Sequence, residues 1–403
     1  MAGKESDQRD TGDMGSVIAV PGPGANVSRL RKERGWGQAR LAAAAGVSTS
    51  QLGKIERGER TLTQGVAASL ARAMSLSLEE VLGTTPVPLD AAGSVRALNS
   101  AVRRFDLPRE PEMTEDEIAA ALASMGEARN SADLDQVLVD LPRLVAGAQD
   151  HAHAMGTPEA CALVVEAYST VYWLAARHRW MTLADLAVTK QKLAAQQSDP
   201  VTAALAARDE AGVYLNHGEF DDGLAVVDRA ITQAEGSTTG PGRSYALGIL
   251  HLRGLTLAGR LQDKRTADQH ITRAWAMAEG FTEDVERCGI QFGPENTAVH
   301  VIATSGDLRR HADAISTMED LVRDGTSLPA TRTSPLHMNT ARSRLALGDR
   351  EGALADLEQA WALAPQMAKV HPTSQEVLRV LTSAHKRSNP RIVKLAKKAH
   401  IQF

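Results

Sequence analysis

One stretch of 15 residues, GVSTSQLGKIERGER (46–60), gathers small polar side chains and a lysine around two apolar residues. If the stretch is helical, Leu52 and Ile55 lie on one side and the polar residues lie on the other. The side chains expected to face the bases of DNA are Thr49, Ser50 and Lys54. The major groove is about 12 Å wide and admits one helix whose short polar side chains reach base edges. The pattern therefore predicts a helix that reads bases.

The charge around this stretch supports the same interpretation. Eight lysines and arginines face three glutamates between Asn26 and Arg60, although the whole chain carries a net charge of −4. Ser48 is expected to cap the helix, and Gln51 to reach a flanking base or phosphate. The candidate DNA-binding residues are Gln38, Ser48, Thr49, Ser50, Gln51, Lys54, Arg57 and Arg60. Serine and threonine pair with several bases, so the operator sequence cannot be read from them.

Several short helices are needed to hold this segment. The pattern predicts helices over residues 27–34, 38–45, 49–56, 63–74 and 78–82. Asn26, Thr63 and Ser77 are the predicted N-caps, and Gly46 provides the left-handed residue of a tight turn between two helices. We expect one small domain over residues 26–83, preceded by a disordered tail over residues 1–25 that is rich in Gly, Pro, Asp and Ser.

The segment LRKERGWGQARLAAAAGVSTSQLGKIERGER (30–60) resembles the helix-turn-helix of the XRE family of DNA-binding proteins, to which the lambdoid phage repressors belong. The resemblance implies that Gln38 binds a backbone phosphate and supports the recognition helix, and that Arg60 lies near a phosphate-contacting loop. It also implies an internal salt bridge between Arg31 and Glu56. This sequence departs from the family pattern at two positions: Gly37 replaces a Ser or Thr cap, and Leu62 replaces a common proline.

The composition sets the class of the whole chain. A length of 403 residues indicates more than one domain, and 43% hydrophobic residues with only 3% aromatic residues favour close-packed helices, so we expect an all-α fold. Cys161 and Cys288 match no metal or redox spacing and are interpreted as buried thiols of a reducing compartment. We see no apolar run that approaches a membrane span and no signal peptide, and expect a cytoplasmic, nucleoid-associated protein.

The remainder of the sequence also predicts helices. Residues 84–113 are expected to form a linker that contains one helix, SVRALNSAVRRF (94–105), and residues 114–403 to form about a dozen helices. Helices are predicted to start at a capping box at Thr114, at Thr157 before Pro158, and at Asp199 before Pro200. Three similar stretches, HGEFDDGLAVVDRAI, SGDLRRHADAISTM and LGDREGALADLEQAWALAP, place Gly and an acid at a turn between two helices. They indicate stacked helical hairpins.

This C-terminal part is similar to the tetratricopeptide-type domain found behind XRE modules in actinobacterial regulators, on the stretch FGPENTAVH (292–300) among others. It resembles the peptide-responsive RRNPP regulators in domain order alone. The concave face of such a superhelix can hold a peptide or small-molecule effector. The candidate effector-binding residues are Asn216, Arg253, Asn296, Asn339 and Arg342. The alternative for each is a capping or turn residue, and FGPEN is alternatively a loop before a helix with Pro294 in its first turn.

These patterns predict a one-component, homodimeric transcription regulator that binds an inverted-repeat operator and has a helical repeat domain for dimerisation and effector binding. The alternative is a DNA-tethered scaffold whose repeat domain docks another protein. No enzyme motif, cofactor or metal site is expected, and His151 and His153 lie two residues apart and cannot face one metal from a helix.

Overall fold

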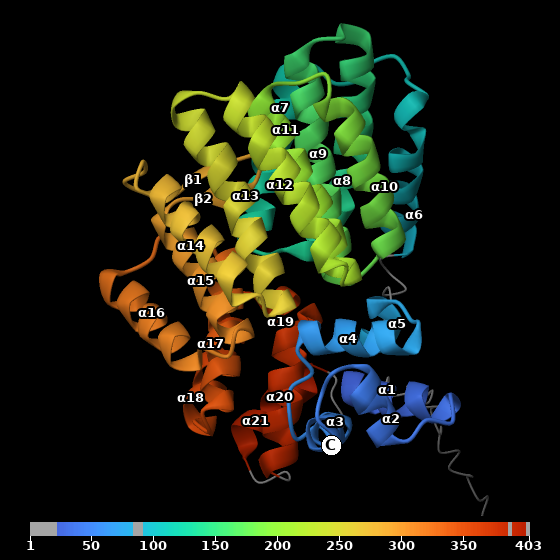
Figure 1. Cartoon of the computed structure of the whole chain (residues 1–403). Helices are drawn as coiled ribbons and strands as arrows, with labels where there is room; N and C mark the ends of the chain where they lie inside the picture. Colours follow the sequence, from blue (N-terminus) through green and yellow to red (C-terminus); the bar gives the residue numbers. More distant parts are fainter. Residues whose placement is uncertain (1–21, 84–91, 386–388, 400–403) are drawn as a thin grey trace, which may run out of the picture.

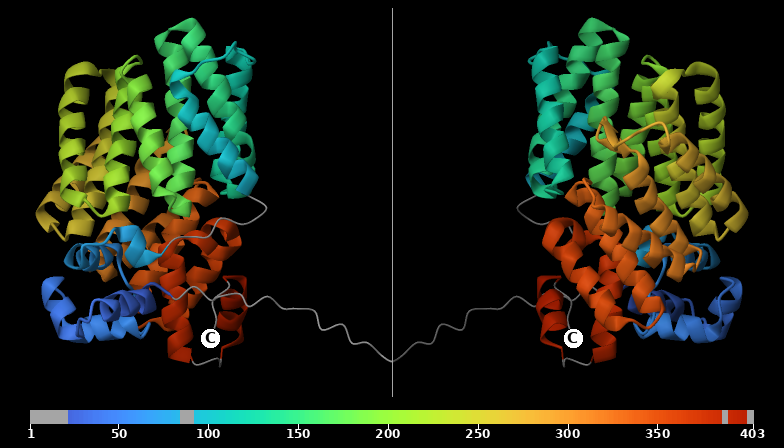
Figure 2. Two further views of the ribbon diagram at one scale, coloured as in Figure 1. Left: turned by 90° about the vertical axis from the view of Figure 1, so that its right-hand side faces the viewer. Right: turned by 90° about the vertical axis from the view of Figure 1, so that its left-hand side faces the viewer.

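The computed structural model describes residues 22–83, 92–385 and 389–399. These residues form helices throughout, apart from one short hairpin of two strands, and the all-α prediction is confirmed (Figure 1). The N-terminal domain (residues 22–83) lies at one end of a larger helical region (residues 92–399) and beside its last helices (Figure 2). The molecule therefore consists of two bodies of helices that contact each other.

The N-terminal domain has the five predicted helices. They are α1 (Pro23–Glu33), α2 (Gln38–Ala44), α3 (Thr49–Glu56), α4 (Gln64–Met74) and α5 (Leu78–Leu82). The hydroxyls of Ser48, Thr63 and Ser77 accept hydrogen bonds from the first turns of α3, α4 and α5, and Gly46 has a φ of +65°, so these caps and this turn are confirmed.

The start of the first helix differs from the prediction. α1 begins at Pro23, whose fixed φ suits a first helical position, so Asn26 is not the N-cap. Asn26 lies inside the helix, and its Nδ2 donates to the carbonyl oxygens of Glu80, at 2.7 Å, and Val81, at 2.9 Å. The side chain therefore ties α1 to the C-terminal end of α5. The predicted tail over residues 1–25 lies outside the described residues up to residue 21.

The helix predicted in the linker is present as α6 (Ala92–Arg103), which continues into the 3₁₀ turn η1 (Arg104–Asp106). It packs on α8, and Leu98 and Val102 are fully buried in the main core of the helical region. α6 is therefore part of that region, because its apolar face found a partner. The rest of the predicted linker before it, residues 84–91, lies outside the described residues.

Fifteen helices follow in the described part of the chain, more than the dozen expected. They are α7 (Glu115–Asn130), α8 (Leu134–Met155), α9 (Pro158–His178), α10 (Met181–Ala195), α11 (Pro200–His217), α12 (Phe220–Ser237), α13 (Gly240–Leu261), α14 (Lys264–Ala278), α15 (Pro294–Asp307), α16 (His311–Asp324), α17 (Ala330–Ala346), α18 (Arg350–Leu363), α19 (Pro365–Val370), α20 (Pro372–His385) and α21 (Pro390–Lys398). The predicted caps Thr114, Thr157 and Asp199 are confirmed at α7, α9 and α11.

The helices from α7 to α18 form two layers of antiparallel hairpins. Helices α7, α9, α11, α13, α15 and α17 contact one another in series, and each also packs against the even-numbered helices that flank it in sequence. α17 also contacts α7, so the odd-numbered helices close into a ring. We call them the inner helices.

The three similar stretches lie where they were predicted, at turns between paired helices. Gly218 and Gly348 adopt the left-handed conformation, with φ of +81° and +88°, after α11 and α17. The middle stretch differs, because Gly306 stays inside α15 and Arg309 takes the left-handed φ of +63°. A side chain at Gly306 would crowd Arg342 of α17, so the glycine there serves packing between helices.

The hairpin of β1 (Val285–Arg287) and β2 (Ile290–Phe292) was not predicted. Each strand has only three residues, too few to show an alternating pattern. The Tyr245 hydroxyl of α13 donates toward the carbonyl oxygens of Arg287, at 3.0 Å, and Ile290, at 2.8 Å. Phe292 then inserts over α13 in full burial. The alternative for FGPEN is confirmed, since Pro294 occupies the first turn of α15.

The N-terminal domain shares a hydrophobic cluster with the helical region. Ala68 of α4 and Leu78 of α5 lie against the turn at Gly218, where a side chain on the glycine would overlap Ala68. The same cluster includes Leu215 of α11 and Leu257 of α13. The domain is therefore docked on the ends of α11 and α13.

Candidate nucleic-acid interface

The recognition helix α3 is seated by two apolar side chains. Leu52 is 0% and Ile55 1% exposed, and both belong to the core of the N-terminal domain. The Ser48 hydroxyl accepts from the Gln51 backbone N–H at 3.1 Å, which fixes the first turn of the helix. Burial of one face determines which residues the other face presents.

That outer face has the predicted composition. Thr49, Ser50 and Lys54 are all exposed, and Gln51 is half-buried at the edge. Thr49 and Ser50 lie in the first turn and Lys54 one turn further on. The structure therefore brings together, on one accessible helix face, the residues expected to face bases.

A buried ion pair supports this helix from behind. Arg31 Nε and Nη2 donate to the two carboxylate oxygens of Glu56 at 2.7 and 2.9 Å, and Gln38 Nε2 donates to Glu56 at 2.8 Å. Burial opposes ionisation of Glu56, but the hydrogen bonds from Arg31 and Gln38 outweigh it and lower its pKa. The salt bridge implied by the family resemblance is confirmed. Gln38 thereby joins the start of α2 to the end of α3 and supports the recognition helix.

The two arginines beyond α3 have different surroundings. Arg57 forms a two-point ion pair with Glu59, at 2.7 and 2.9 Å, and would have to leave it to bind a phosphate. Arg60 is exposed.

One positioning residue was missed because it falls in the predicted tail. Gly24 of α1 approaches the end of α3 so closely that a Cβ there would overlap the carbonyl oxygen of Ile55. Gly24 therefore permits α1 to cross α3 at short range. A Pro-Gly-Pro-Gly run suggests a loop, and no signal in the sequence distinguishes this glycine from its neighbours.

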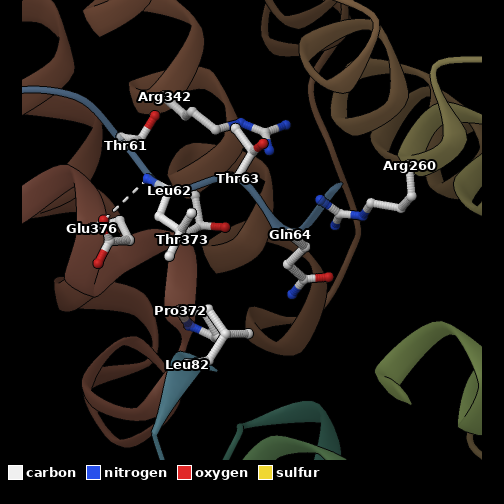
Figure 3. A pocket seen from close by; sticks show the side chains of 10 residues that line it. All are labelled: Thr61, Leu62, Thr63, Gln64, Leu82, Arg260, Arg342, Pro372, Thr373 and Glu376. Atoms are coloured by element: carbon white, nitrogen blue, oxygen red, sulfur yellow. Dashed lines mark hydrogen bonds between the residues drawn. The ribbon is translucent and has the colours of Figure 1, made fainter. Parts of the chain in front are cut away.

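The loop after α3 is attached to the helical region. The Leu62 backbone N–H donates to Glu376 of α20 at 3.2 Å (Figure 3). Arg379 donates to the same carboxylate at 3.0 Å. Burial raises the pKa of Glu376, although Arg379 and the Leu62 N–H oppose that shift. Figure 3 shows the small pocket around this contact, between residues 61–64, Arg260, Arg342 and the start of α20. Because 314 residues separate the partners, sequence reasoning missed Glu376.

Two of the predicted effector-binding residues lie together on inner helices. Asn216 Nδ2 of α11 donates to the Tyr172 hydroxyl of α9 at 3.2 Å and to the Gly212 carbonyl oxygen at 2.7 Å. Arg253 Nε of α13 donates to the Arg208 carbonyl oxygen at 3.2 Å. A side chain on Gly212 would overlap both the Tyr172 hydroxyl and the Arg253 guanidinium, so these groups meet over that glycine.

The other three predicted residues donate to different protein groups. Arg342 is buried, and its guanidinium donates to Asp307 at 2.7 Å, a carboxylate that Arg260 also pairs with at 3.1 Å. Asn296 is 1% exposed and donates to the Gln291 carbonyl oxygen at 2.7 Å. Asn339 donates to the Pro335 carbonyl oxygen, one turn back in α17, at 2.9 Å. Each of the five predicted residues thus has a hydrogen-bond partner within the protein, and their role in effector binding stays a prediction.

Metal-binding groups, free cysteines and membrane-spanning helices can be checked within the described residues. Within the described residues, no group of three or more His, Cys, Asp and Glu side chains could hold a metal ion. Cys161 and Cys288 are both free thiols; the first is buried and the second half-buried. Among the helices of the described chain, none combines the length and apolar character that a membrane crossing requires.

Comparison with known proteins agrees with this geometry in the N-terminal domain. The helix-turn-helix family model matches residues 27–81. No curated protein sequence matches the chain.

Solved structures are similar over more of the chain but distantly. BtubC from P. vanneervenii is 16% identical, covers 57% of this chain and 90% of its own, with a TM-score of 0.39. The PrgX/iCF10 complex is 9% identical over 94% of this chain and 95% of PrgX, with a TM-score of 0.25. The apo form of the competence regulator ComR from Streptococcus vestibularis is 12% identical over 90% and 97%, with a TM-score of 0.20. Similarity at this level carries no argument about function.

The family match, the five helices with their caps, and the exposed face of α3 over its buried seat agree with one another. Residues 27–81 are therefore a helix-turn-helix domain.

Proposed function

We propose that this protein binds a specific DNA sequence as a homodimer and that its helical region senses an effector. The observation that carries the first part is the exposed face of α3, with Thr49, Ser50 and Lys54 above the buried Leu52 and Ile55. Such a helix enters the major groove with its N-terminal residues toward the bases. Base-edge contacts from these three side chains would specify the sequence.

Phosphate contacts would position the domain without specifying sequence. Gln38 and Ser48 stand at the beginnings of α2 and α3, where helix N-termini favour phosphates. Gln51 lies in the first turn of α3, and the exposed Arg57 and Arg60 follow its last turn, so all three are assigned to phosphates or flanking bases. Arg57 would exchange Glu59 for a phosphate, a change between two charged partners on the protein surface.

A dimer follows from the size of the domain. A single module of about 60 residues buries little surface on DNA, and two modules on half-sites about 34 Å apart double the contact. The operator is therefore proposed to be an inverted repeat. Dimerisation is assigned to the helical region, which contributes most of the chain.

The contact between the two bodies supports a sensing role for the helical region. The N-terminal domain shares its hydrophobic cluster with α11 and α13, which also present Asn216 and Arg253 near the Tyr172 hydroxyl. A peptide or small molecule that moved these helices would move the docked domain with them. The spacing of the two recognition helices on DNA would then change, and with it the affinity for the operator.

The experiment is selection of genomic fragments by the full-length protein at physiological salt. The test variant replaces Thr49, Ser50 and Lys54 by alanine, and a matched control replaces Lys264, Gln269 and Thr272, which are exposed on α14. The native protein and the control are expected to enrich one palindromic motif, and the test variant is expected to lose it. Equal enrichment by all three proteins would refute the assignment of α3. Enrichment of no motif by the native protein, with a protein partner recovered in its place, would favour a docking scaffold.

A further inference from the structure

Basic residues occur on every one of the inner helices of the helical region. The inner helices α7, α9, α11, α13, α15 and α17 contact one another in series, and α17 closes the series on α7. Each of these six helices contributes one basic residue to the set considered next. We call this set the ring, and it consists of Arg129, Arg177, Arg208, Arg253, His300 and Arg332.

Hydrogen-bond donors crowd together where α9, α11 and α13 meet. Arg253 Nε lies 3.2 Å from the Arg208 carbonyl oxygen, and Asn216 Nδ2 lies 3.2 Å from the Tyr172 hydroxyl. The Arg253 guanidinium and the Tyr172 hydroxyl both occupy the space that a side chain on Gly212 would fill. Glycine at this position therefore lets donors from three helices converge.

Two guanidinium groups of the ring have unused donors. The Nε atoms of Arg129 and Arg332 are buried and have no hydrogen-bond partner within the residues that the structure describes. Arg129 is only 3% exposed, and its terminal nitrogens donate to Thr170 and to the Gly289 carbonyl oxygen. A buried donor without an acceptor costs free energy, which an oxygen of a bound ligand would recover.

The ring is also electrostatically uncompensated. Burial, and then the charges of Arg208, Arg129 and Arg253, lower the pKa of Arg332 to about 9, so this group stays a cation at neutral pH. Burial followed by Arg332 and Arg129 lowers the pKa of Arg177. Like charges held near one another out of water favour an anion between them.

The carboxylates near the ring are engaged or held back from ionisation. Asp209 pairs with Arg208 at 2.7 Å and accepts from the Ser169 hydroxyl at 2.7 Å. Burial raises the pKa of Glu166. Glu286 accepts from Asn130 at 2.9 Å at the surface. Burial and the charges of Arg332, Arg208 and Arg253 hold the pKa of His300 well below its usual value, so the positive charge of the set comes from its five arginines, which outnumber these three carboxylates.

The buried arginines nearer the N-terminal domain are arranged differently. Arg260 and Arg342 share the carboxylate of Asp307, at 3.1 and 2.7 Å. A pair of arginines around one buried carboxylate is a structural arrangement that needs no ligand. Within the described residues, no ion pair joins two arginines of the ring to one carboxylate, and Arg177, Arg208, Arg253 and Arg332 are half-buried rather than sealed.

We propose that the inside of this ring binds a small organic anion that carries phosphate or carboxylate groups. Guanidinium groups hold such oxygens by two parallel, charge-assisted hydrogen bonds, which Arg332, Arg253 and Arg177 would supply. The role of this anion as the effector rests on the proposed function, whereas its binding is argued from the ring alone.

Thermal unfolding of the full chain tests the binding. The probes are pyrophosphate, citrate and the tetrapeptide tetraglutamate, each compared with KCl at equal ionic strength and with tetralysine. Binding to the folded state raises the midpoint of unfolding as probe concentration rises. A rise with pyrophosphate or citrate alone assigns a small polyanion, and a rise with tetraglutamate alone assigns an acidic peptide. No rise beyond the KCl control with any of the three probes overturns the inference.

Two variants locate the site. Arg332→Gln is expected to raise the midpoint without a probe, because it removes a cation that its neighbours repel, and to weaken the response to the best probe at least about tenfold. Arg253→Gln is expected to weaken the same response. Arg323→Gln, at an exposed arginine paired with Asp320, is the control and should change neither value. An unchanged response in both ring variants would also overturn the inference.

Two further measurements separate this site from the DNA-binding face and from the proposed function. The triple alanine variant of Thr49, Ser50 and Lys54 should keep the full response, since its substitutions lie outside the ring; loss of the response there would place the anion on the DNA-binding face and refute the ring site. Operator affinity with and without the best probe tests the effector role. An unchanged affinity would remove that role and leave both anion binding and DNA binding in place.

Discussion

The two bodies of this molecule treat buried positive charge in opposite ways. In the N-terminal domain the buried Arg31 meets a carboxylate at two points, and Gln38 completes the set around Glu56. In the helical region Arg129 is buried and Arg332 half-buried, and each has a buried Nε donor without a partner among the described residues. Full pairing makes a rigid support for a helix that must present a fixed face. Incomplete pairing leaves an interior able to accept an anion.

Histidines sharpen the same contrast. The sequence has no histidine between residues 22 and 83, while the helical region buries several. Burial, assisted by nearby arginines, lowers the pKa of His371 to about 3, and burial with Arg177 lowers that of His178 to about 4. Burial and His270 lower the pKa of His251 to about 4. Below the ordinary pKa of 6.5 the unfolded chain binds these protons and the folded chain does not.

Acidification is expected to have the largest effect, and to act on the helical region. Stability should fall as the pH drops from 6.5 toward 4, by up to about 1.4 kcal/mol per pH unit for each such histidine. The N-terminal domain is held by Glu56, whose lowered pKa keeps that contribution until the pH falls below about 4.5. Denaturant unfolding at pH 7.5 and pH 5 measures the loss. Cleavage by a glutamate-specific protease at pH 5, mapped by mass spectrometry, should find its first sites after residue 21 beyond residue 92; earlier cuts within residues 22–83 would contradict the contrast.

Breaking the paired cluster is expected to have the next largest effect. Arg31→Ala removes one of the two side-chain donors described for the Glu56 carboxylate and leaves Gln38 as the other. The free energy of unfolding should fall by about 3 to 5 kcal/mol. Glu33→Ala, which removes an exposed pair with Arg29, is the control and should cost less than about 1 kcal/mol. Denaturant unfolding of the full chain gives both values. Equal costs would show that the buried pair is not what supports α3.

A base-reading residue should change specificity at one position. Lys54→Ala should relax the preference for one base pair by about 1 to 3 kcal/mol, whereas Gln38→Ala and Arg60→Ala should weaken binding to all sequences alike. Competition binding with operators that differ at single positions measures each case. An unchanged preferred sequence in the lysine variant would mean that α3 is oriented differently on DNA.

The contact between the two bodies should give the smallest effect. Glu376→Ala leaves the buried Leu62 N–H without its acceptor and should cost about 1 to 3 kcal/mol, with faster amide exchange over residues 57–64. Glu376→Gln keeps an oxygen at that place and should restore most of the protection. Hydrogen-exchange mass spectrometry compares the two variants. Protection that is lost equally in both would assign the contact to the charge of Glu376.

Local features of the helix-turn-helix were predictable because they depend on neighbours in sequence. The caps Ser48, Thr63 and Ser77 and the turn at Gly46 act within four residues, so residue type and spacing suffice. The start of α1 was misplaced because Asn26, a common N-cap, bonds instead to the distant end of α5.

The interior of the helical region was less predictable for the opposite reason. Arg342 was expected in an effector site, but it pairs with Asp307, which lies 35 residues away. Arg332 drew no attention in the sequence, since an arginine near the start of a helix is ordinarily a surface residue. Its place in a ring depends on six helices meeting, and the contact of α17 with α7 joins segments about 200 residues apart.

The sequence by itself determined the helical class, the helix-turn-helix and the side chains on the outer face of α3, because helix periodicity and capping are local. Only the tertiary structure decided which buried charges are paired and which are not. It also decided that the loop at Leu62 is held by Glu376. These outcomes depend on how helices pack at long range, where the partner of a charged side chain is set by the fold and not by its neighbours along the chain.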